Sequence, residues 1–134
     1  MSPLPSIRAL AAIAASAFLL SAAGAAAPDA PPDLAEVAAA ARQLSARLPM
    51  RADDITTAVA IRADGAEFVY EMAVSQALPA DRIEQIRRSI QDLNQSRMCE
   101  NAEVAPFIRR GGSMRHIYVD QAGHRFETRV SRCP

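Results

Sequence analysis

The chain has no lysine and no tryptophan, only five glycines and two cysteines, and no net charge. Its low glycine count and its hydrophobic content of 50% exclude collagen-like and wholly disordered proteins. A length of 134 residues allows one domain. The absence of lysine is most simply a matter of codon usage in a GC-rich genome, and we draw no functional conclusion from it.

Short catalytic motifs are also missing from the sequence. There is no P-loop, no G-x-G-x-x-G segment and no G-x-S-x-G segment. Adjacent carboxylates occur at Asp53-Asp54, where capping and solvation are sufficient explanations. We therefore expect no catalytic residue, no cofactor and no bound metal.

The first 26 residues have the three parts of a secretory signal peptide. Arg8 supplies the positive start, residues 10–20 form an apolar run, and the small residues 21–26 offer A-x-A cleavage geometry. A transmembrane anchor would need a stronger apolar stretch of about 20 residues. We expect a cleaved leader and a periplasmic or secreted bacterial protein without stable membrane insertion.

Charge is distributed unevenly beyond this leader. Residues 28–81 carry nine carboxylates and four arginines, whereas residues 82–134 carry six carboxylates and ten arginines. Together they have no basic excess that would hold nucleic acid or anionic lipid, so we expect no nucleic-acid partner. Either the two halves pair with each other in the fold, or the basic half forms a face for an acidic partner.

Cys99 and Cys133 are the only cysteines. A lone pair in an oxidising compartment usually forms an intramolecular disulfide. The alternatives are a dithiol redox site, which normally has C-x-x-C spacing, and a metal site, which needs more ligands. We predict a structural disulfide that tethers the end of the chain to the end of a helix.

The remaining sequence divides into two segments of similar layout. In the first, a flexible proline-rich extension over residues 27–32 precedes Asp33, which can cap a helix with one apolar stripe. Alternation of apolar and polar residues then predicts a strand over 55–62 and a return strand over 68–74, joined by a turn at Asp64-Gly65.

The second segment repeats this order of elements. A helix opens at residues 79–81 and runs to about Met98, and a helical turn within residues 100–110 ends at Gly111-Gly112. A second hairpin follows, with strands over residues 114–120 and 125–132 and a turn at 121–123.

These elements predict an α+β fold with one domain over residues 33–134. Each αββ unit leaves one apolar face uncovered. The economical packing is therefore one four-stranded antiparallel sheet with two helices on one face, stapled by one disulfide.

The order of these features resembles a group of small exported bacterial proteins of unassigned function. The pattern consists of a helix, a hairpin, a second helix, a cysteine, a second hairpin and a final cysteine. Its residues are Leu48-Pro49, Asp53, Thr56, Tyr70, Cys99, Gly111-Gly112, Tyr118, Asp120, Gly123 and Cys133. The resemblance spans about residues 34–133. It supports the fold and the disulfide, and it implies no enzymatic activity or cofactor.

Two histidines, His116 and His124, lie on or beside the last hairpin. If they faced each other, a metal would still need further ligands such as Asp120 or Glu127. Histidines near a turn are more often solvated or hydrogen-bonded surface groups, which is our prediction here. A small secreted hydrolase-like or metal-assisted enzyme using both histidines is the alternative to a binding protein.

The segment Arg109-Arg110-Gly111-Gly112 is one candidate for anion or partner binding. Consecutive amides in a glycine turn can form a concave anion site, and two guanidinium groups beside it could contact a carboxylate or phosphate. The same residues are equally expected at a helix C-terminus, where glycine stops the helix and cations face its carbonyl end.

A second candidate is the arginine row formed by Arg115, Arg125 and Arg129. These side chains alternate with Phe126, Thr128 and Val130, so they belong to the opposite face of the last strands. If helices cover only one face of the sheet, the arginines line an open surface. That surface is either simply solvated or a docking site for an acidic envelope or secreted protein.

Our leading hypothesis is therefore a small, exported, non-catalytic binding or accessory module. It would act through protein contacts, using the open sheet face or an exposed strand edge.

Overall fold

The computed structural model describes residues 29–134. The predicted signal peptide, residues 1–26, lies outside the described residues, as do residues 27–28 of the predicted extension. The elements in chain order are α2 (Leu34–Ser45), β1 (Met50–Arg51), β2 (Thr56–Asp64), β3 (Glu67–Val74), a short 3-10 turn (Ala80–Arg82), α3 (Ile83–Glu100), α4 (Val104–Arg109), β4 (Ser113–Val119) and β5 (Arg125–Val130). No helix in this part of the chain has the length and apolar character needed to cross a membrane.

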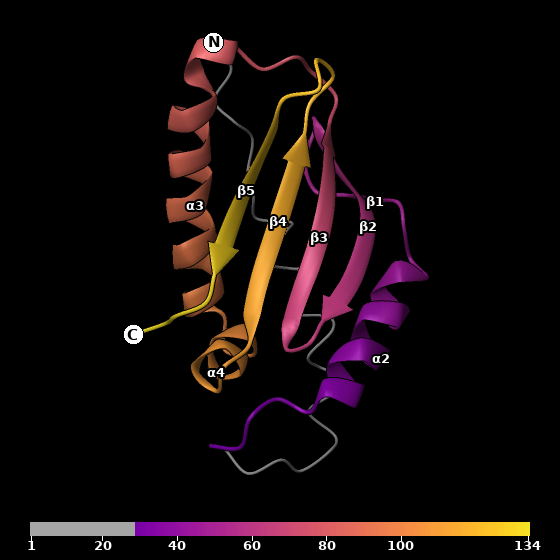
Figure 1. The fold of residues 1–134 in the computed structure, drawn as a ribbon, viewed down its shortest axis with the longest axis vertical. Coiled ribbons are helices and arrows are strands. Elements are labelled where there is room, and N and C mark those ends of the chain that lie inside the picture. Colours follow the sequence, from indigo (N-terminus) through magenta and orange to yellow (C-terminus); the bar gives the residue numbers. More distant parts are fainter. Residues whose placement is uncertain (1–28) are drawn as a thin grey trace.

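The five strands form one mixed sheet in the order β1-β2-β3-β4-β5 (Figure 1). Strands β3 and β4 pair in parallel, and the other neighbours pair antiparallel. The α+β class is confirmed, but the prediction of a four-stranded antiparallel sheet is wrong in two respects. The sheet has an additional strand, β1, and strands β3 and β4 run in the same direction.

Helix α3 accounts for the parallel pair. Its 18 residues extend about 27 Å at 1.5 Å per residue, which is enough to carry the chain back along the sheet. Strand β4 therefore starts where β3 starts, with Ser113 beside Glu67. The two αββ units are joined by a crossover of the βαβ type, and not as two stacked hairpins.

Helix α2 begins where the sequence predicts. The Asp33 carboxylate accepts hydrogen bonds from the backbone N–H groups of Ala35 and Glu36, at 2.8 and 3.1 Å. This satisfies amides that have no partner in the first turn of a helix. The buried side chains of the helix form one stripe: Val37, Ala40, Ala41 and Leu44.

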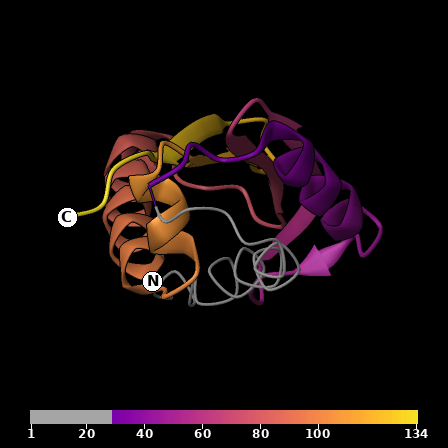
Figure 2. The ribbon, with the colours of Figure 1, turned by 90° about the horizontal axis from the view of Figure 1, so that it is seen from below.

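The core lies on one face of the sheet and includes side chains from both long helices. The register brings together Phe68, Met114 and Val130 in one row, and Met72, Tyr118 and Phe126 in another. Helix α2 contributes its apolar stripe, and α3 contributes Ile90 and Met98. Figure 2 shows α3 and α2 at opposite edges of the curved sheet, beside β5 and β2 respectively.

Helix α3 covers the outer edge of β5 with glutamine side chains. Gln91 donates to the carbonyl of Arg129 at 2.7 Å and accepts from its N–H at 2.8 Å, as a neighbouring strand would. Gln95 donates to the carbonyl of Arg132 at 2.6 Å. These contacts occupy backbone groups that could otherwise pair with a strand of another protein.

A similar contact is made at the other side of the sheet. The Ser45 hydroxyl at the end of α2 donates to the Ile61 carbonyl of β2 at 2.6 Å. Both helices thus occupy edge positions of the sheet, so binding by strand addition is disfavoured at these residues. The open sheet face is left as the more favourable contact surface.

The predicted disulfide between Cys99 and Cys133 is confirmed. It links the last turn of α3 to the segment that follows β5. Gln95 contacts both the Cys99 sulfur and the Arg132 carbonyl. The covalent link and this side chain together hold the end of the chain against α3.

Replacing both cysteines with serine should lower the free energy of unfolding by about 3–4 kcal/mol. The disulfide closes a loop between residues 34 positions apart in sequence. Without it the unfolded chain gains conformational entropy, which favours unfolding. Urea denaturation of the oxidised protein, the reduced protein and the Cys99→Ser/Cys133→Ser variant measures this difference. The reduced protein is the matched control and should agree with the variant. A variant as stable as the oxidised protein contradicts the prediction.

Candidate binding surface

Charged side chains form rows across the sheet face opposite the core, which we call the open face. It comprises Arg62, Glu67, Val69, Glu71, Ser113, Arg115, Ile117, Val119, Arg125, Glu127 and Arg129. One row across β2 to β5 contains Arg62, Val69, Arg115 and Arg129, and the next contains Glu71, Ile117 and Glu127. Rows of opposite charge are therefore neighbours along the strands.

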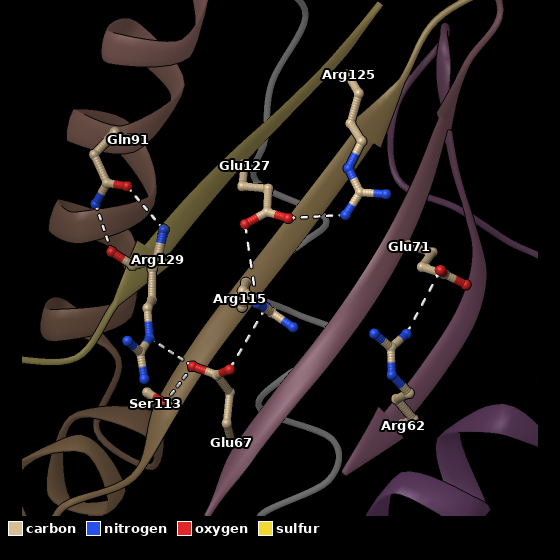
Figure 3. Close-up of polar contacts among 9 residues, drawn as sticks. All are labelled: Arg62, Glu67, Glu71, Gln91, Ser113, Arg115, Arg125, Glu127 and Arg129. Carbon is tan, nitrogen blue, oxygen red and sulfur yellow. Dashed lines mark hydrogen bonds and ion pairs between the residues drawn. The ribbon is translucent and has the colours of Figure 1, made fainter. Parts of the chain in front are cut away.

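The Glu67 carboxylate joins three strands at one end of the open face (Figure 3). Its Oε2 atom accepts hydrogen bonds from Ser113 Oγ at 2.7 Å and from Arg129 Nε at 2.6 Å. Its Oε1 atom lies 3.5 Å from Arg115 Nε. Only 11% of the Glu67 side chain is exposed, so these contacts are poorly screened by water. An acidic residue of the first half thus pairs with arginines of the second half.

The other ion pairs of the open face are more exposed. Glu127 contacts Arg125 at 2.9 Å and Arg115 at 3.9 Å, and Glu71 contacts Arg62 at 3.5 Å (Figure 3). The face therefore presents four arginines and three glutamates. Each guanidinium has five N–H donors, so these contacts leave donors available for a further acceptor.

Two apolar residues in the middle of the open face are buried although no helix of the described chain packs there. Val69 lies between Arg62 and Arg115, and Ile117 lies between Glu71 and Glu127. The aliphatic stems of long charged side chains can cover such residues while their charged ends stay in water. Val119 is different, with 41% of its surface exposed. It provides an apolar contact point at the end of the open face.

Arg109, Arg110, Gly111 and Gly112 lie at the end of α4, outside the open face. The N–H groups of Gly111 and Gly112 bond to the carbonyls of Ile108 and Phe107, which is the Schellman arrangement that ends a helix. Both amides are therefore occupied within the fold. The Arg109 guanidinium donates one hydrogen bond to the Pro134 carbonyl at 2.9 Å. An anion could therefore be bound here only by the remaining N–H groups of the two guanidinium groups, and not by the glycine amides.

The prediction that both histidines lie at the surface is wrong for His116. Its side chain is fully buried in the core, with its ring centre 4.9 Å from that of Tyr70 and 6.3 Å from that of Tyr118. Neither ring nitrogen has a hydrogen-bond partner. The alternation of Met114, His116 and Tyr118 is the sequence signal that could have identified this position as part of the core.

His124 is held elsewhere, by Asp120 in the β4–β5 turn. Its Nδ1 atom lies 2.8 Å from the Asp120 carboxylate, so the two histidines do not face each other. Within residues 29–134, no group of three His, Cys, Asp or Glu side chains is arranged to hold a metal ion.

The Asp120 carboxylate fixes the last hairpin to the segment that follows β3. It accepts hydrogen bonds from the backbone N–H groups of Leu78 and His124, both at 2.7 Å, and contacts the His124 ring. Burial raises the pKa of this carboxyl, but the hydrogen bonds from His124 and Leu78 outweigh burial and hold the pKa at about 2. Asp120 is therefore charged in the folded protein under ordinary conditions.

Alternation in the sequence predicts three of the four arginines of the open face, Arg115, Arg125 and Arg129, but neither Arg62 nor the glutamate partners. Alternation with Phe68 and Tyr70 could have assigned Glu67 and Glu71 to the same face as Arg115. Pairing Glu67 with Arg115 and Arg129 required the parallel register of β3 and β4, for which the sequence contains no direct signal. Glu67 and its partners are 46 to 62 residues apart.

Two solved structures have a similar fold. One is a Pseudomonas aeruginosa protein predicted to be secreted, with 16% sequence identity and a TM-score of 0.56, covering 80% of this chain and 95% of that chain. The other is a pilotin from the Vibrio vulnificus type 2 secretion system, with 18% identity and a TM-score of 0.59, covering 73% of this chain and 86% of that chain. No family model and no curated protein sequence matches the chain. At this sequence identity the similarity shows the fold alone. One of the two proteins is itself predicted to be secreted, in line with the expected group of small exported proteins, but the specific residue pattern of that group is not tested.

Removing the charge of Glu67 should destabilise the protein more than removing that of Glu71. Glu67→Gln leaves Arg115 and Arg129 without their shared carboxylate and should lower the free energy of unfolding by about 1–3 kcal/mol. Glu71→Gln is the matched control, because its pair with Arg62 is half exposed and such pairs contribute about 0–1 kcal/mol. Urea denaturation at low and high salt measures both. Equal effects of the two substitutions would contradict a special role of Glu67.

Asp120 should make the free energy of unfolding depend on pH in the acid range. Its folded pKa of about 2 lies below the unfolded value of about 3.9. Its contribution is therefore complete above about pH 4 and is lost as the pH falls toward 2. Asp120→Asn should be less stable at neutral pH and should lose less stability over this acid range. Thermal unfolding as a function of pH tests this, with Asp92→Asn on the exposed side of α3 as the control for losing one negative charge.

Proposed function

We propose that this chain is a small exported accessory module that acts by binding another protein of the cell envelope. The observation that carries the proposal is the open face, a wide sheet surface with exposed arginines on a fold whose strands β2 and β5 are contacted by helices. The interaction surface would consist of side chains, because helix side chains occupy backbone groups of β2 and β5.

The placement of the acid–base residues supports a binding role over the enzymatic alternative. Glu67 and Asp120 bind groups of their own chain, and His124 contacts Asp120. His116 is buried away from any substrate. These groups stabilise the fold, so they are poor candidates for acid–base or metal-assisted chemistry.

The similar structures support an exported accessory protein. One is predicted to be secreted, and the other is a pilotin of a secretion system. The signal-peptide pattern and the disulfide favour the same location, because disulfides persist in oxidising compartments.

The chemistry of the open face favours an acidic partner. The side chains of Arg125 and Arg129 are each 60% exposed, whereas Glu67 is largely buried beneath its arginine partners. Carboxylates of a partner could bind the unused N–H donors in the two-point geometry that guanidinium groups prefer. Exposed Val119 would add apolar contact beside these charges.

Site-specific photo-crosslinking of the exported protein in cells tests this proposal. A photoreactive residue at Val119 should give a reproducible crosslink to one envelope protein. The same residue at Ser96, which is exposed on α3, is the control position and should not give this product. The crosslink at Val119 should weaken as the salt concentration rises, because charge attraction is screened.

Reversing the charge of arginines on the open face tests whether they are needed for the crosslink at Val119. Arg62→Glu/Arg125→Glu should abolish the crosslink at Val119, because both side chains lie at the exposed parts of the open face. Arg88→Glu is the matched control, since it reverses an exposed arginine on α3 that pairs with Glu84. Capture of a protein is not sufficient support. A product that survives reversal on the open face, or appears equally at Ser96, contradicts the proposal.

A further inference from the structure

His116 lies on the core face of β4, the fourth strand of the sheet, which is flanked by β3 and β5. It is paired in register with Tyr70 of β3 on one side and with Thr128 of β5 on the other. Its ring stacks on Tyr70, at an interplanar angle of 20°. A leucine or phenylalanine would be the usual residue in such an apolar position, so a histidine here calls for a physical explanation.

The groups around His116 are polar but uncharged. Tyr70 faces it from β3 and Tyr118 from its own strand, and burial raises the pKa of both phenols. From α3, Asn94 donates to Thr128 at 3.0 Å and to the Tyr118 hydroxyl at 3.4 Å. The carboxylate of Asp53 acts electrostatically on Tyr118, but no acidic side chain of the described chain bonds to the His116 ring.

Several buried polar atoms of this cluster also have no hydrogen-bond partner. They are Tyr70 Oη, Asn94 Oδ1 and both ring nitrogens of His116. A neutral imidazole can occupy such a site, although its unmade hydrogen bonds destabilise the fold. An imidazolium would place an unpaired positive charge in the core, which is far less favourable.

We propose that His116 is an acid-sensitive switch, whose protonation opens the packing between α3 and the central strands of the sheet. The geometry behind this proposal is a fully buried ring whose two nitrogens bond to no group of residues 29–134, carboxylates included. The ring can take up a proton only when water reaches it, both to deliver the proton and to accept hydrogen bonds from the imidazolium that forms. The switch is independent of the proposed binding function, and it would operate whether or not the open face has a partner.

The direction of the pH effect follows from the two pKa values of His116. Burial lowers the folded pKa to about 3, whereas an unfolded or opened histidine has a pKa of about 6.5. Between these values the opened state binds one more proton than the closed state. Stability is therefore complete above about pH 6.5 and falls continuously as the pH decreases toward 3.

Stability measured between pH 7.5 and 4.5 tests the proposal in a range above most carboxylate titrations. His116 should reduce the folding equilibrium constant about 100-fold over this interval, because one proton is gained on opening. His116→Phe and His116→Leu should remove this reduction. His124→Asn should retain it, and is the matched control because His124 is the other histidine of the chain. Equal pH dependence in the wild type and the His116 variants would overturn the proposal.

An NMR titration of the unmodified protein decides the question even if the variants do not fold. The chain has two histidines, so their imidazole signals can be assigned from the His124→Asn spectrum alone. In the folded protein the His116 signal should stay that of a neutral ring down to the pH at which opening begins. Amide exchange in β4 and β5, corrected for its intrinsic pH dependence, should increase over the same range. A His116 ring that titrates near pH 6.5 without faster exchange would overturn the proposal.

Discussion

The contact of the Glu67 carboxylate with Ser113, Arg115 and Arg129 is the interaction on which the open face depends. It connects β3 to β4 and β5 where the parallel pair begins. Because Glu67 belongs to the acidic half of the chain and its arginine partners to the basic half, the charge difference between the halves is at least partly neutralised inside the fold. The same contact keeps the arginine rows in register across the strands.

Separation of the two sheet faces explains the rest of the architecture. The core face carries the aromatic and aliphatic side chains that pack with α2 and α3, and the open face carries paired charges. Helix side chains bond to backbone groups of β2 and β5, and the disulfide holds the chain end beside α3. A surface of side chains, rather than a strand edge, is thus left for contact with other proteins. His116 departs from this separation together with Thr128 beside it, because both are buried polar residues on the core face.

Local features of the fold could be predicted from the sequence, and long-range pairing could not. The Asp33 cap, the alternation around Tyr70 and the cysteine pair each have a short-range or compositional signal. Alternation assigns a residue to a face but does not say which strand lies next to it, so the parallel β3–β4 pair was predicted wrongly. The two-residue strand β1 is too short to have a pattern, and a glutamine such as Gln91 gives no signal that it will bond to a strand. At the candidate surface, alternation identified Arg115, Arg125 and Arg129, but the contact of Glu67 with Arg115 and Arg129 depends on the unpredicted register of β3 and β4.

Glu67 joins the acidic and the basic halves of the chain through Arg129. A double-mutant cycle with Glu67→Gln, Arg129→Gln and the combined variant measures this interaction most directly. Urea denaturation of the four proteins should give a coupling free energy of about 1–3 kcal/mol, as expected for contacting residues in one ion-pair network. A coupling near zero would mean that the contact contributes nothing to joining β3 with β5, and would contradict the account.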